Sequence, residues 1–326
     1  MLVIARRLFF YVVTAAVAIS LDFLIPRLIP GNPVDAILAK MQGVTITPAI
    51  IRALDLQFGV NTHASLWGQY AHYWNNVLHG NLGLSSGNGF APVSTVIREA
   101  LPYTLGLIGV ATIISFLIGT AIGALVAWKR GSWLDNLLPA VTFFQAAPYF
   151  FLAFLAIDVF AVILGWFPPS RAAGATDFPA FTWTYLSDLL DHAVLPALTI
   201  VVASAAGWIV GMRNVMLTTM DEDYVLIAAA KGLRKARVIW YAARNAILPS
   251  VSGFALAIGF IMSGALLTEI VFSYPGLGSL LLQAVSNNDY SLMQGLFLIV
   301  TFTVLAANLI ADFVYVFLDP RTRQEA

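Results

Sequence analysis

The sequence has 326 residues, of which 60% are hydrophobic and only 10% are charged. Ordinary soluble domains carry about 25% charged residues, so this composition excludes a single soluble domain and predicts an all-α protein that crosses a membrane several times. The formal net charge is zero, which gives no reason to expect nucleic acid as a partner, and the absence of cysteine excludes disulfide bonds and thiol chemistry.

The first apolar run covers residues 8–29 and follows two arginines. Residues 16–18 resemble a signal-peptidase site, but the run continues for long enough to span a bilayer, which takes about 20 apolar residues. We therefore predict a first transmembrane helix within residues 1–30. Asp22 and Arg27 lie near its far end, where we expect them to reach the membrane interface or to pair with each other.

A polar segment without a spanning run follows over residues 31–99. A threonine followed by proline predicts a short helix over residues 48–58. Apolar and aromatic residues recur at helical spacing over residues 65–78, which predicts an amphipathic helix on the membrane surface or against the outer ends of the spans. The glycine-rich stretch 80–89 contains no basic residue, so we interpret it as a turn rather than a phosphate-binding loop.

Further apolar tracts complete a predicted set of six transmembrane helices. The second and third tracts exceed the length needed for one span, and we expect them to be tilted, broken or interrupted at Pro139 and Pro148. Twelve of the seventeen lysines and arginines fall on one side of this arrangement. The positive-inside rule therefore places both termini and residues 221–249 in the cytoplasm, and residues 31–99 outside. The tracts after the first cover residues 101–128, 134–167, 193–217, 250–272 and 292–318.

Residues 221–249 form a charged, strongly basic segment between two long apolar runs. Acidic residues precede a short helix predicted over residues 224–231, which Gly232 should end because glycine adopts positive φ. A second helix is predicted over residues 234–245, and we expect Pro249 to open the fifth span, where its missing N–H costs little. The segment would act as a lever; the alternative is a solvated loop whose basic residues only set the topology.

This segment resembles the cytoplasmic coupling loop of ABC importer permeases, in the branch that handles peptides. The general pattern of these loops has a glutamate at the position of Leu226. The peptide branch also lacks this glutamate. The matching residues are Asp223, Tyr224, Val225, Ala228, Ala230, Lys231, Gly232, Leu233, Arg244, Asn245, Ala246 and Pro249. Further stretches similar to the same branch are 28–33, 80–83, 129–135, 271–278, 289–290 and 318–321.

The resemblance implies the first permease subunit of an importer in a bacterial or archaeal inner membrane. The implied partners are a second homologous permease, two cytoplasmic ATPases and an external solute-binding protein, and ATP and Mg would bind to the ATPases. None of the four lysines follows a glycine, as a phosphate-binding loop would require, so we expect this chain to be no enzyme and to bind no cofactor. ATPase coupling is assigned to Asp223, Tyr224, Ala228, Ala230, Lys231, Gly232, Leu233 and Pro249.

Two questions stay open at this point. The relatives of this branch import dipeptides and oligopeptides, but others import oligosaccharides, including β-glucosides, or nickel chelates. The alternative class is a secondary transporter driven by an ion gradient, which usually needs ionisable groups within the membrane. Asp158 and Glu269 are the candidate residues of the pathway, and we expect hydration or a neighbouring charge to satisfy Glu269 and Asp312. Four scattered histidines give no spacing typical of a metal site.

Overall fold

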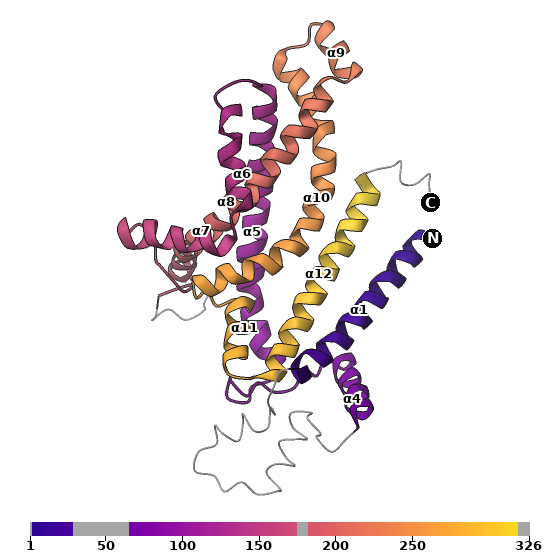
Figure 1. The fold of residues 1–326 in the computed structure, drawn as a ribbon, viewed down its shortest axis with the longest axis vertical. Coiled ribbons are helices and arrows are strands. Elements are labelled where there is room, and N and C mark those ends of the chain that lie inside the picture. The colour runs from indigo at the N-terminus through magenta and orange to yellow at the C-terminus, as the bar shows by residue number, and fades with distance from the viewer. Residues whose placement is uncertain (1, 29–64, 175–181, 319–326) are drawn as a thin grey trace, which may run out of the picture. The chain divides into compact units, whose positions relative to one another are not determined.

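The computed structural model describes residues 2–28, 65–174 and 182–318, and helices dominate all three ranges (Figure 1). The helix predicted over residues 48–58 lies outside the described residues. The stretches 28–33 and 318–321, which carried part of the family resemblance, lie almost entirely outside them as well.

The chain divides into two compact units. Unit 1 combines Met1–Thr104 with Pro275–Leu305, and unit 2 combines Leu105–Tyr274 with Ala306–Ala326. The helices α5 (Val93–Trp128) and α12 (Tyr290–Leu318) therefore belong partly to each unit. Unit 1 also contains α1 (Leu2–Leu28), α4 (Leu66–Leu78) and α11 (Leu277–Ser286). The remaining helices of unit 2 are η1 (Asp135–Leu137), α6 (Leu138–Ala146), α7 (Tyr149–Ala156), η2 (Ile157–Ile163), α8 (Trp183–Met220), α9 (Asp223–Ala230) and α10 (Lys235–Val271).

In unit 1, α4 confirms the amphipathic helix predicted over residues 65–78. Ser65 caps it by accepting a hydrogen bond from the Gly68 N–H, and its aromatic side packs on α1. Asp22 is buried in unit 1, where its Oδ2 accepts a hydrogen bond of 2.8 Å from the hydroxyl of Tyr73 on α4. Its expected position at the membrane interface or beside Arg27 stays a prediction.

The glycine-rich stretch 80–89 is a turn, as predicted, and a buried carboxylate organises it. Asp289 Oδ2 accepts hydrogen bonds from Ser85 Oγ at 2.6 Å and from the Gly87 N–H at 2.8 Å. Its Oδ1 accepts from the Leu292 N–H at 3.1 Å, which caps the first turn of α12. One side chain therefore joins the turn to the start of the last helix of unit 1.

In unit 2, the third apolar tract is broken, which is one of the alternatives predicted from its length, whereas the second tract is the unbroken α5. The break lies at Pro148, where α6 ends and α7 begins, and the two halves of the tract are bent by 102° (Figure 1). Pro139 lies in the first turn of α6, where its missing N–H is tolerated, so it does not interrupt the helix. Beyond α7 the chain continues as the π-helical segment η2, which contains Asp158.

Close packing of α5 against α8 depends on two glycines one turn apart. A Cβ added to Gly119 would lie 2.8 Å from the Ala205 carbonyl oxygen, and one added to Gly123 would lie 2.5 Å from that of Ile209. Small residues at this four-residue spacing allow helix backbones to approach closely within a membrane. The crossing therefore fixes α5 to the middle of α8.

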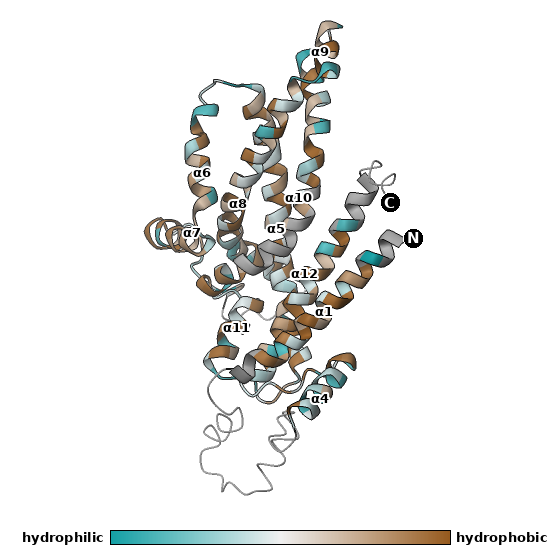
Figure 2. Ribbon diagram, turned by 45° about the vertical axis from the view of Figure 1, so that its right-hand side comes forward, coloured by the Kyte–Doolittle hydropathy of each residue, from teal (hydrophilic) through white to brown (hydrophobic). Residues whose placement is uncertain are grey.

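Within the described residues, three helices are long and apolar enough to cross a membrane: Val93–Trp128, Trp183–Met220 and Tyr290–Ile310. The bent pair of α6 and α7 with its flanking segments would make a fourth. Figure 2 shows hydrophobic residues along most of α5 and α8, with hydrophilic residues gathered toward the end of unit 2 that carries α9. The total of six transmembrane helices remains a prediction.

We expect the change Gly123→Ala to lower the midpoint of thermal unfolding of the purified protein, because the added methyl group would push α5 away from the α8 backbone. Overpacking of this kind costs about 1–3 kcal/mol. Gly109→Ala is the matched control, since a Cβ at Gly109 of the same helix meets nothing within 4 Å. Equal midpoints for the two variants would contradict the close crossing.

Candidate coupling site

The short helix α9 lies between the ends of α8 and α10, at one end of unit 2 (Figure 1). α8 ends at Met220, and the Asp221 N–H donates to the Thr218 carbonyl at 3.3 Å. Glu222 is the N-cap residue of α9, and Asp223 occupies its first turn, where negative charge interacts favourably with the helix dipole. The helix spans Asp223–Ala230, one residue earlier than predicted.

Gly232 ends α9 in the way the sequence predicted. Its φ is +76°, and its N–H donates to the Ala229 carbonyl at 3.0 Å while the Leu233 N–H donates to the Ala228 carbonyl at 3.4 Å. These two hydrogen bonds define a Schellman motif, which requires a residue with positive φ at this position. A Cβ at Gly232 would meet nothing within 4 Å, so only the backbone conformation favours glycine here.

Val225 anchors α9 to the rest of unit 2. It is buried in an apolar cluster with Met212 and Met216 of α8 and with Val238 and Ala242 of α10. Leu233, which follows the turn, also packs against this cluster. The sequence interpretation overlooked this role of Val225, whose only signal was its place in the matching pattern. The anchor joins α9 to both neighbouring helices, so that they and α9 form one packed body.

The opposite side of α9 is exposed and apolar. Leu226 and Ile227 are 55% and 53% exposed, and Tyr224 is partly exposed beside them. Acidic residues flank this surface at the start of α9. Exposed basic residues flank it at the other end: Lys231, Arg234, Lys235 and Arg237. The surface is therefore apolar and bordered by charges of both signs.

Of the predicted coupling residues, the structure brings seven together around α9 and its turn. Asp223, Tyr224, Ala230, Lys231 and Gly232 are exposed, whereas Ala228 and Leu233 are half-buried.

The eighth predicted coupling residue, Pro249, does not open the fifth span. It lies inside α10, which runs without a break over Lys235–Val271, so the separate helix predicted over 234–245 is the first part of this longer helix. Pro249 lacks the N–H that would donate to the Asn245 carbonyl, and such prolines are tolerated in membrane helices because neighbouring groups compensate. The consequence is a direct helical connection from the turn at Gly232 into the fifth predicted span.

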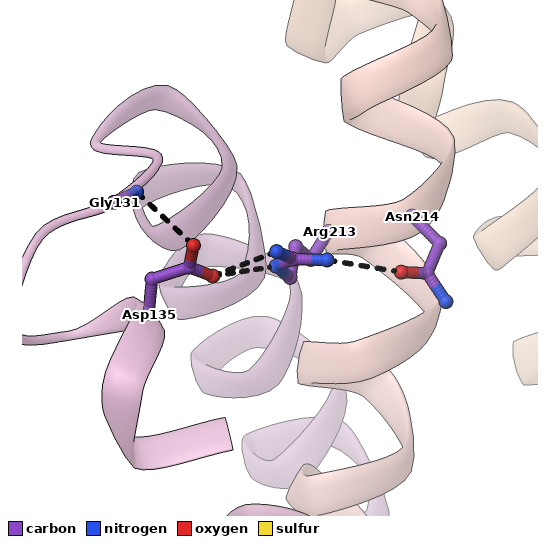
Figure 3. Close-up of polar contacts among 4 residues, drawn as sticks. All are labelled: Gly131, Asp135, Arg213 and Asn214. Atoms are coloured by element: carbon purple, nitrogen blue, oxygen red, sulfur yellow. Dashed lines mark hydrogen bonds and ion pairs between the residues drawn. The ribbon is translucent and has the colours of Figure 1, made fainter. Parts of the chain in front are cut away.

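A partly buried ion pair ties η1, which leads into α6, to α8 (Figure 3). Arg213 Nε and Nη2 donate to Asp135 Oδ1 at 2.9 and 2.7 Å, and the Gly131 N–H donates to Asp135 Oδ2 at 3.1 Å. Arg213 Nη1 also lies 3.4 Å from Asn214 Oδ1. Arg213 follows Met212 in α8, and Met212 belongs to the cluster that contains Val225. The ion pair is therefore next to the α8 side of that cluster. The sequence interpretation counted Arg213 only as a cytoplasmic charge; Asp135 ends the matching stretch 129–135.

The two candidate pathway residues lie in different surroundings. Asp158 is exposed in η2, and π-helical turns are frequent at functional sites. Glu269 is completely buried in α10, so bulk solvent does not reach it in this chain, and Asp312 is half-buried. The pathway role of Asp158 and Glu269 stays a prediction. Among the described residues, no group of three or more His, Asp or Glu could hold a metal ion.

The long apolar helices are those of a helical membrane protein. The chain belongs to the family described as the binding-protein-dependent transport system inner membrane component, whose model matches residues 119–324. It is 35% identical to a putative peptide permease protein of Brucella suis over 93% of both chains. It is 34% identical to the di/tripeptide transport system permease protein DppB of Pseudomonas aeruginosa, over 99% of this chain and 98% of that one.

A further relative and a solved structure are also similar to this chain. The oligopeptide transport system permease protein AppB of Bacillus subtilis is 32% identical over 92% of both chains. Among solved structures, the inward-facing MetNI methionine ABC transporter contains a chain that aligns with a TM-score of 0.55, over 69% of this chain and 96% of that one, at 15% identity. The structural likeness establishes a shared fold.

We expect Asp135→Ala and Arg213→Ala each to lower the midpoint of thermal unfolding, because each variant leaves a charged partner without its hydrogen bonds. The double variant should be no less stable than the less stable of the two single variants. Thermal unfolding of the four purified proteins measures this cycle, with Arg234→Ala at an exposed position as the control. Effects that simply add would show that the two residues do not interact.

Proposed function

We propose that this chain is one of two permease subunits of an ATP-driven peptide importer, in which it forms the translocation pathway with a second, homologous permease. The observation that carries the proposal is similarity over nearly the whole chain to proteins named as peptide permeases. The exposed apolar face of α9 supports it independently, because a permease driven by separate ATPases needs a surface on which they dock.

In this proposal, the face of α9 around Tyr224, Leu226 and Ile227 docks on one of two cytoplasmic ATPases, which bind ATP and Mg. Movement of the ATPase is transmitted through the Val225 cluster to α8 and α10 together. Because α10 continues without a break from the turn at Gly232, displacement of α9 moves the span itself. The Asp135–Arg213 pair extends the same movement to α6 and so to the bent tract.

An external solute-binding protein would deliver the peptide to the side of the membrane opposite α9. The printed names of the relatives favour peptides over oligosaccharides or metal chelates as the cargo. The family description, which specifies a component of a binding-protein-dependent system, favours this mechanism over a transporter driven by an ion gradient. Asp158 and Glu269 remain the proposed residues of the pathway.

We expect Gly232→Val to abolish most ATP-dependent peptide uptake while the protein still inserts into the membrane, because a β-branched residue adopts positive φ only at high cost. Gly232→Asn is the matched control, since asparagine tolerates this conformation and the site leaves room for its side chain. Uptake is measured in liposomes that contain the complex purified through a tag on this chain, and mass spectrometry identifies the subunits.

Recovery of a second permease and two ATPases with the wild-type chain is the expected composition. Normal uptake by the Gly232→Val variant would refute the lever. Recovery of this chain alone, with uptake driven by an ion gradient and without ATP, would refute the proposed function.

We propose six transmembrane helices with both termini in the cytoplasm, and cysteine labelling tests this topology without background because the chain has no cysteine. A cysteine at the exposed Ser94 should react with an impermeant thiol reagent in intact cells. A cysteine at the exposed Ala236 should react only after the cells are opened. The reverse pattern would invert the topology.

A further inference from the structure

Helix α4 of unit 1 has an apolar side that is only partly covered. Tyr70 and Tyr73 face α1, where their rings lie 5.2 and 5.6 Å from the ring of Phe23. The Tyr70 hydroxyl shares a hydrogen bond of 2.6 Å with Ser20 Oγ, and the Tyr73 hydroxyl donates to Asp22. These contacts fix the rotation of α4 about its own axis, and with it the direction of every other side chain on the helix.

Beside the tyrosines, the same apolar side continues without a cover. Trp67 is 80% exposed and Leu78 is 73% exposed. With 3.6 residues per turn, Trp67, Ala71 and Leu78 project next to one another, and together with the covered tyrosines they form one continuous arc of less than half the circumference. The polar residues Gln69, His72, Asn75 and Asn76 occupy the rest of the circumference, as the two colours of α4 in Figure 2 illustrate.

The chemistry of α4 favours a lipid interface as the occupant of this uncovered arc. The helix contains no Lys, Arg, Asp or Glu, so it offers nothing for charge pairing with another protein. Tryptophan and tyrosine are the side chains enriched where the hydrocarbon meets the headgroups, since one end of the ring is apolar and the other can donate a hydrogen bond. An amphipathic helix with one apolar and one polar side can bury its apolar side at the boundary between the hydrocarbon and the headgroups.

The uncovered arc also continues a surface of α1. Val17, Leu21 and Leu24 of α1 are exposed, and they border Ser20, whose hydroxyl bonds to Tyr70. α1 is the first predicted transmembrane helix, and its exposed apolar residues are those that would face lipid. Exposed apolar residues of α1 therefore lie beside the residue that binds Tyr70 of α4.

From these observations we propose that α4 is an interfacial anchor, which lies in the membrane boundary with Trp67, Ala71 and Leu78 in contact with lipid. Tyr70 and Tyr73 attach this anchor to α1. The anchor would hold the adjoining end of α1 at a fixed depth in the bilayer. This inference does not depend on the cargo or on the ATPases.

Site-directed spin labelling of the complete transporter in lipid nanodiscs tests the anchor. Single cysteines at Ala71 and Leu78 probe the uncovered arc, and single cysteines at the exposed His72 and Asn75 are the matched controls on the polar side. All four variants keep Trp67 and the two tyrosines. The measurement is the rate of collision of each label with oxygen, which concentrates in lipid, and with a water-soluble nickel chelate.

We expect the ratio of oxygen to nickel collisions to be several-fold higher at positions 71 and 78 than at 72 and 75. A high nickel rate at all four positions would place α4 in water and overturn the proposal. Low rates of both reagents at 71 and 78 would show that protein covers the arc, which would also overturn it and would indicate a docking site for a partner subunit.

Discussion

Burial of Val225 against α8 and α10 is the contact on which the coupling site depends. An eight-residue helix has little stability by itself, because the cost of nucleating a helix is recovered only over longer lengths or by packing. The methionines of α8 and the small residues of α10 supply that packing. With Val225 facing inward, Leu226 and Ile227 must face outward, so the anchor and the proposed docking face are two consequences of one orientation.

Two further contacts hold other helices on α8, to which Val225 attaches α9. Gly119 and Gly123 bring α5 onto α8, and Arg213 binds Asp135 to hold the start of α6 on the same helix. α8 therefore joins three elements: α5, the bent tract and α9. A force on α9 would be transmitted to packed helices rather than to a loop. This arrangement suits a protein in which the energy source is a separate subunit.

Unit 1 uses buried polar groups for a similar purpose. Asp289 binds the turn at 80–89 to the start of α12, and Asp22 receives the hydroxyl of Tyr73 from α4. The sequence interpretation placed Asp22 at an interface because an aspartate within an apolar helix is costly to bury without a donor. The donor lies 51 residues away in the sequence, and no local pattern indicates it.

The sequence by itself determined the class of protein, the break in the third tract, α4, and the turn at Gly232. Each of these depends on local composition, periodicity, or a residue with a special backbone preference. It did not determine the run of α10 through Pro249, because the proline rule describes isolated helices, whereas the surroundings decide whether a helix continues. The partnership of Arg213 with Asp135, the anchor at Val225 and the burial of Glu269 were decided only by the tertiary structure. They depend on which residues distant in the sequence meet, and packing alone determines that.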